Sequence, residues 1–155
     1  MRTVDRLRIR APASRVFAAA AAVERWPDIL PHYRWVTRQG REQDAEIVEM
    51  AAWRQFGLFR YPTWWRSQMW TDPAGRAIRY HHIAGLTKGM DVEWRLEADG
   101  NETEVTIVHQ WDGPAWPLIK RPAADWVIGP LFISAIASRT LAGIGRFAEL
   151  AESDG

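Results

Sequence analysis

The chain has 155 residues, a length typical of one domain with its own core, so we expect residues 1–155 to form a single domain. The charges of its 20 Lys and Arg nearly balance those of its 19 Asp and Glu, and no run of basic residues could bind along a phosphate backbone. Both observations argue against a nucleic acid as partner. Cysteine is absent, which excludes disulfides, thiolate metal sites and a cysteine nucleophile, and we expect neither a metal ion nor another cofactor.

No segment of the sequence is expected to cross a membrane. The alanine run at 18–22 is far too short to span a bilayer. A secretory signal would need a continuous apolar region directly after the first charged residues, and that region is missing. We therefore expect a cytoplasmic protein without a transmembrane segment.

The chain opens with a strand and two short helices. Apolar and arginine residues alternate in Thr3–Arg10, which predicts a half-buried strand. Ser14 is placed to cap the helix that follows, where apolar residues recur at helical spacing. We expect Trp26 and Pro27 to end this helix, because a residue before proline is driven out of the α region. Residues 28–30 are expected to form one further turn.

From Tyr33 onward the chain consists of β-type runs separated by turn-forming sequences. The clearest run is 90–98, where four apolar residues alternate strictly with charged ones, as in a strand with one dry face and one wet face. The predicted strands are Tyr33–Gln39, Ala45–Trp53, Arg60–Trp70, Arg76–Ala84, Met90–Ala98 and Glu102–Trp111.

The last part of the chain is expected to hold a proline-rich segment and a long helix. Asp112–Gly129 has three prolines and no clean period, which predicts a lid, a binding loop, a core-covering loop or a short helix. Pro130 suits a first helical position, and Leu131–Glu152 has a broad apolar stripe. Gly143 and Gly145 each cost about 1 kcal/mol in a helix interior, so we expect close packing or ligand space beside them.

The order of strand, two short helices, six strands and long helix predicts an α+β fold. Antiparallel strands in a row form one sheet of seven, and the helices gather on one side of it. We expect the sheet to curl around the last helix.

Several motifs carry a resemblance to a known family. They are Ala11-Pro12-Ala13, the run 23–31, Trp65-Arg66-Ser67, Gly85 and Trp94. The chain resembles the START-like (Bet v 1-like, SRPBCC) superfamily, in particular its polyketide cyclase/dehydrase and coenzyme Q-binding branch. The resemblance implies a helix-grip fold, in which a seven-stranded antiparallel sheet wraps around a long C-terminal helix and leaves an elongated apolar cavity. Members include aromatase/cyclases, lipid and quinone carriers, hormone receptors and a ribosome-associated toxin.

Three residues are candidates for chemistry in this cavity. Strand parity places His109 on the face of Ile107, and His82 on the face of Tyr80. A buried imidazole stays neutral and can exchange a proton near neutral pH, although each histidine could instead simply fill the core. The resemblance implies that Arg66 stabilises negative charge on a ligand oxygen, yet neighbouring strand residues face opposite ways, so at most one of Arg66 and Ser67 points inward.

The ten tryptophans suggest an aromatic wall for a flat apolar ligand, since each ring covers about 150–250 Å². The alternative is that the rings only fill a small core. The candidate ligand-binding residues are Trp26, Tyr33, Trp35, Trp53, Trp65, Tyr80, Met90, Trp94, Trp111, Phe132, Ile136 and Arg139.

Three functions remain open at the level of sequence. The first is a polyketide cyclase or aromatase that performs aldol cyclisation and dehydration, with an acyl carrier protein as a possible partner. The second is a non-catalytic carrier of a quinone or a membrane-derived lipid. The third is a protein-interaction module of the toxin-like branch. The first two share a hydrophobic small molecule as the expected ligand.

Overall fold

The computed structural model describes residues 1–56, 58–113 and 130–153, and within these ranges the side chains at 56, 61, 130–132 and 152–153 are not described. The predicted segment Asp112–Gly129 therefore lies almost wholly outside the described residues. The elements are β1 (Arg2–Ile9), α1 (Ala13–Ala21), the 3-10 helix η1 (Val23–Arg25), α2 (Trp26–Ile29), β2 (Tyr33–Glu42), β3 (Ala45–Phe56), β4 (Phe59–Asp72), β5 (Ala77–Gly85), β6 (Asp91–Asp99), β7 (Glu102–Gln110) and α4 (Pro130–Ser153).

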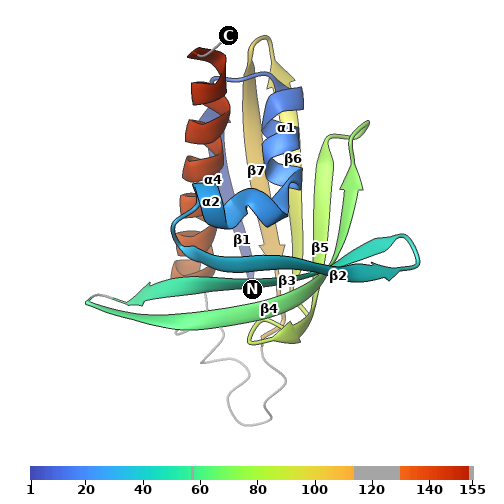
Figure 1. The fold of residues 1–155 in the computed structure, drawn as a ribbon, viewed down its shortest axis with the longest axis vertical. Coiled ribbons are helices and arrows are strands. Elements are labelled where there is room, and N and C mark those ends of the chain that lie inside the picture. The colour runs from blue at the N-terminus through green and yellow to red at the C-terminus, as the bar shows by residue number, and fades with distance from the viewer. Residues whose placement is uncertain (57, 114–129, 154–155) are drawn as a thin grey trace.

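The seven strands form one antiparallel sheet in the order β1-β7-β6-β5-β4-β3-β2. The sheet bends strongly: β1, β6 and β7 run along α4, whereas β2, β3 and β4 cross beneath its lower half (Figure 1). The helix α4 packs mainly against β1 and α1. This arrangement confirms the predicted α+β class and the helix-grip fold.

Two bulges in β2 change which side chains face the helix. The register skips Arg34 between Tyr33 and Trp35, and it shifts again between Arg38 and Gly40. An extra residue in one strand reverses the alternation beyond it. Tyr33 is therefore buried, whereas both Arg34 and Trp35 are exposed.

The predicted helix boundaries near the N-terminus were wrong in two details. The residue that precedes the first turn of α1 is Pro12, and no side chain caps the helix, because Ser14 already lies within the first turn. The helix ends at Ala21 rather than at Trp26. Trp26 adopts helical dihedral angles and begins α2, because Pro27 falls in the first turn, where a missing N–H costs nothing.

The two glycines of α4 are explained by close packing. A Cβ atom at Gly143 would overlap the side chain of Leu30, which is completely buried. A Cβ atom at Gly145 would meet Ile9 at 3.3 Å and Leu7 at 3.5 Å. Both glycines thus let α4 pack closely, Gly143 against Leu30 after α2 and Gly145 against β1.

Gly85 at the end of β5 offers a sharp test of the sheet geometry. Its φ is +94°, and an added Cβ atom would overlap the backbone oxygen of Trp64 and lie 2.8 Å from Trp65 Cα. We expect Gly85→Ala to lower the free energy of unfolding by about 3 kcal/mol, measured by urea denaturation. Gly89→Ala is the matched control, because Gly89 has φ +87° with open space around it, and should cost only about 1 kcal/mol. Equal losses would contradict the overlap.

Candidate functional site

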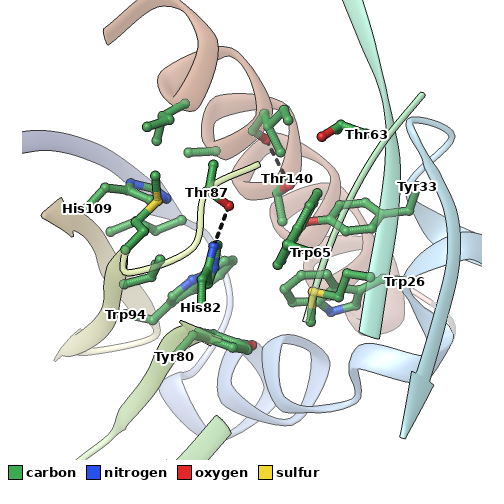
Figure 2. A pocket seen from close by; sticks show the side chains of 17 residues that line it. Trp26, Tyr33, Thr63, Trp65, Tyr80, His82, Thr87, Trp94, His109 and Thr140 are labelled. Carbon is green, nitrogen blue, oxygen red and sulfur yellow. Dashed lines mark hydrogen bonds between the residues drawn. The ribbon is translucent and has the colours of Figure 1, made fainter. Parts of the chain in front are cut away.

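A cavity of about 80 Å³ lies between the bent sheet and α4. Each strand from β2 to β7 contributes at least one side chain, and α2, α4 and the β5–β6 connection complete the wall (Figure 2). The lining residues are Trp26, Tyr33, Met50, Thr63, Trp65, Tyr80, His82, Thr87, Met90, Val92, Trp94, Ile107, His109, Ile133, Ile136, Ala137 and Thr140.

One side of the cavity is a connected aromatic wall. The ring of Trp26 lies 5.2 Å from Tyr33 in an edge-on arrangement and 5.8 Å from Trp94. Tyr33 in turn meets Trp65 edge-on at 6.1 Å. Trp26 is fixed by its indole N–H, which donates to the carbonyl oxygen of Ala19. Such pairs each add about 0.5–1.5 kcal/mol beyond their buried area, so this wall holds its shape.

Two histidines face the aromatic wall from β5 and β7. The ring of His82 stacks on Trp65 at 5.9 Å with an angle of 17° between the planes. His82 Nδ1 lies 2.7 Å from the hydroxyl of Thr87, which belongs to the β5–β6 connection (Figure 2). This connection is held by hydrogen bonds from the His82 N–H to Met90 O and from the Gly89 N–H to His82 O.

Both imidazoles are neutral at pH 7. Burial lowers the pKa of His82 to about 3, and the positive charges that His109 and His81 can carry contribute less. Burial also lowers the pKa of His109 to about 4. The cause is desolvation, which disfavours the charged form.

Two polar atoms of the wall have no partner within the described part of the chain: the hydroxyl oxygen of Tyr80 and Nδ1 of His109. Burial raises the pKa of Tyr80, so its hydroxyl keeps its proton and can donate a hydrogen bond. An unpaired buried polar group costs free energy until it is satisfied. These two atoms therefore favour a ligand that carries oxygen substituents.

The hydroxyl of Thr140 on α4 has two hydrogen-bond partners. It donates to Ile136 O at 2.8 Å, so it accepts the hydrogen bond from His32 Nε2 at 3.0 Å. Because Thr140 lines the cavity and His32 lies outside it, Thr140 marks the cavity's boundary on this side.

Arg66 is not a lining residue, which corrects its expected role in the cavity. Its Nη2 donates to Glu49 Oε2 at 2.9 Å, across the β3–β4 pair, on the face away from α4. The inward residues of β4 are Thr63, Trp65, Ser67 and Met69, as strand alternation requires. Of the pair Arg66 and Ser67, only Ser67 is buried.

Four other predicted residues also lie elsewhere. Trp35 is exposed because of the bulge at Arg34. Trp53 and Arg139 line a separate outer hollow, and Trp111 fills the core with its indole N–H on Lys88 O at 3.0 Å. Phe132 belongs to α4, but its side chain lies outside the described residues.

The structure brings together the remaining predicted residues: Trp26, Tyr33, Trp65, Tyr80, His82, Met90, Trp94, His109 and Ile136. Sequence reasoning missed several others. Thr63 and Val92 stand two positions from predicted lining residues, so strand alternation was a sufficient signal for them. Ile133 and Ala137 share a helix face with Ile136. Thr87 lies in a connection, where no periodicity points to it.

The described residues show neither a cluster of metal ligands nor a helix that could span a membrane. They contain no group of three or more His, Asp or Glu side chains placed to hold a metal ion. No helix in these ranges is both long enough and apolar enough to cross a membrane.

Residues 9–128 match the family of polyketide cyclase/dehydrase and lipid transport proteins. The chain belongs to this family. The match covers most of the sequence and confirms the START-like resemblance. No curated protein sequence matches the chain.

Solved structures of three proteins are similar in fold to this chain. The Zhui aromatase/cyclase of Streptomyces sp. R1128 is 21% identical, with a TM-score of 0.78 over 96% of this chain and 93% of that one. A Thermus thermophilus protein is 18% identical, with a TM-score of 0.80 over 99% of both chains. Major latex-like protein 151 of Panax ginseng is 10% identical, with a TM-score of 0.74 over 96% and 97%. At these identities the likeness shows the fold alone.

The buried imidazole of His109 predicts a specific dependence of stability on pH. As the pH falls below 6.5, the unfolded chain protonates its histidines, whereas native His109 stays neutral down to about pH 4. The free energy of unfolding therefore falls with pH in this window. We expect His109→Gln to reduce that slope by about 1 kcal/mol per pH unit between about pH 6 and 4.5, measured by urea denaturation. An unchanged slope would show that His109 protonates in the native state.

Proposed function

We propose that this protein binds a flat, hydrophobic, polyketide-like molecule in the cavity and promotes its aldol cyclisation and dehydration. The observation that carries the proposal is an aromatic cavity whose wall presents the unpaired Tyr80 hydroxyl and His109 Nδ1. Apolar rings favour a flat carbon skeleton, and a few convergent polar groups fix its orientation. Membership of the polyketide cyclase/dehydrase family supports the same ligand class.

For this chemistry the protein needs to supply only proton transfers, because the C–C bond that forms and the C–O bond that breaks both lie within the ligand. In the aldol step, a base removes a proton from the carbon between two carbonyls, and that carbon attacks a second carbonyl to form a C–C bond. The new alkoxide takes up a proton. In the dehydration, loss of a further proton and of the hydroxyl group releases one water and forms a C=C bond. No oxidant or reductant is consumed.

Two residues are suited to these steps. In the tautomer with its hydrogen on Nε2, neutral His109 has an unpaired Nδ1 that can accept a proton from the ligand. The Tyr80 hydroxyl can donate to the oxygen on which negative charge develops. Nδ1 of His82 is already engaged with Thr87, which fixes this ring, so we assign His82 a positioning role beside Trp65.

A specific observation favours a second candidate, a non-catalytic carrier of a quinone or lipid. A pKa of about 4 makes His109 a weak base at neutral pH, and Arg66, the cation expected to stabilise an enolate, faces the other side of the sheet. A carrier needs only the apolar cavity. The two candidates differ in the partner that supplies the ligand: an acyl carrier protein for the cyclase and a membrane for the carrier.

The cavity must widen to admit a polycyclic ligand. A cavity of roughly 150 Å³ holds benzene, and this one has about 80 Å³. Met50 and Met90 lie in the wall, and unbranched methionine side chains change rotamer easily. We infer that ligand entry repacks these two residues against the fixed aromatic wall.

A partly filled cavity should weaken ligand binding. Ala137 lies on the cavity side of α4, so Ala137→Leu places three extra carbon atoms inside. We expect this variant to bind uncharged 1,8-dihydroxyanthraquinone about tenfold more weakly than wild type, measured by quenching of tryptophan fluorescence. Ala135→Leu makes the same change on the exposed face of α4 and should leave the affinity unchanged. Equal affinity of both variants would place the ligand elsewhere.

Catalysis is tested by incubation with a poly-β-ketone thioester and detection of the cyclised, dehydrated product by mass spectrometry. We expect His109→Gln and Tyr80→Phe each to lower kcat by about 100-fold while anthraquinone binding is retained. His81→Gln is the matched control, because His81 is the neighbour of His82 on the outer face of β5. Wild-type protein that binds the anthraquinone but releases no cyclised product would refute the cyclase and leave the carrier.

A further inference from the structure

A second hollow, of about 380 Å³, opens outside the cavity. It lies where the link between α2 and β2 meets the β3–β4 hairpin and the middle of α4, and we call it the arginine groove. The contact between His32 and Thr140 separates it from the cavity. The groove residues that matter here are His32, Trp53, Gln55, Arg60, Arg139 and Arg146.

The groove is strongly cationic although the whole chain is nearly neutral. Arg60, Arg139 and Arg146 line it, and Arg34 lies beside Trp53. The sequence has no Asp or Glu in 29–41, 51–71 or 130–148, the segments that build this region. The positive charge of Arg139 also contributes to lowering the pKa of the neighbouring His32 to about 4, after the larger effect of burial.

These four arginines differ from many others in having no counter-ion among the residues that the structure describes. Among the described residues, none of the four takes part in an ion pair. Unpaired like charges held close together repel one another, which destabilises the fold unless an anion balances them. Ion pairs with carboxylates in the described part of the chain include those of Arg8, Arg38, Arg66, Arg79 and Arg95.

Three of these four arginines are also held in place. The guanidinium carbons of Arg34 and Arg60 lie 4.7 and 4.5 Å from the Trp53 ring centre. Arg139 Nη2 donates to Gln55 Oε1 at 3.1 Å, which fixes its direction. A guanidinium has five N–H donors, so each of these contacts leaves donors free for a ligand.

We propose that the arginine groove binds the phosphate group of an organic ligand, with Arg60, Arg139 and Arg146 as its donors and Trp53 as an adjoining aromatic surface. Phosphate combines high negative charge with several acceptor oxygens, which matches several convergent guanidinium groups better than one carboxylate does. The phosphate can belong to a soluble phosphorylated molecule or to a lipid headgroup. This site is independent of the cavity and of the reaction proposed for it.

The test compares two doubly substituted proteins of equal charge. Arg139→Gln with Arg146→Gln removes two groove cations, and Arg2→Gln with Arg6→Gln removes two exposed arginines of β1. Calorimetric titration with inorganic pyrophosphate should show wild-type binding that the groove variant weakens by about tenfold or more. The β1 variant should bind within about twofold of wild type, because its lost charges lie on another element.

A second arm identifies the source of the phosphate. Co-sedimentation with phosphatidylglycerol vesicles, compared with phosphatidylcholine vesicles, should respond to the groove substitutions only if a lipid headgroup is the ligand. Pyrophosphate binding without vesicle binding assigns a soluble phosphorylated ligand. The proposal is overturned if wild-type protein binds neither probe, or if the groove and β1 variants lose affinity equally, because the latter shows unspecific charge attraction.

Discussion

The site depends on a mismatch of shape between a strongly bent sheet and a single straight helix. One helix cannot contact every part of such a sheet, so large rings bridge the space between them. Trp26, Tyr33, Trp65 and Trp94 meet mostly edge-on or tilted, which spreads them around a volume rather than stacking them into a solid block. In the C-terminal half of α4, Gly143 and Gly145 let the helix pack closely against the N-terminal elements. The helix is thus tight at one end and spaced from the sheet at the other.

The degree of burial determines the charge states of the side chains in the cavity and in the arginine groove. Inside the cavity, desolvation keeps the rings of His82 and His109 neutral and the hydroxyl of Tyr80 protonated. Outside it, solvent lets several arginines stay charged side by side in the arginine groove. Thr140 itself lines the cavity, and its hydroxyl accepts a hydrogen bond from His32 of the arginine groove. The neutral cavity and the cationic arginine groove are therefore separated at this point by a single residue, Thr140.

Much of the fold could be predicted from the sequence, because alternation and turn chemistry are local signals. The same alternation placed His109 and Tyr80 correctly in the cavity wall. It failed at Trp35, since a bulge at Arg34 reverses the side-chain direction and leaves no mark in composition. It also could not foresee the arginine groove, whose members come from four segments that only the tertiary fold brings together.

The bent sheet remains open, and this has a consequence for how copies of the protein meet. In the described residues, β1 pairs only with β7 and β2 only with β3, so two strands present unpaired backbone groups along their outer sides. Such borders invite strand addition from another molecule. Here β1 carries three exposed arginines, and β2 combines arginines with two bulges that break the straight row of donors and acceptors. Self-association through these borders is thereby discouraged.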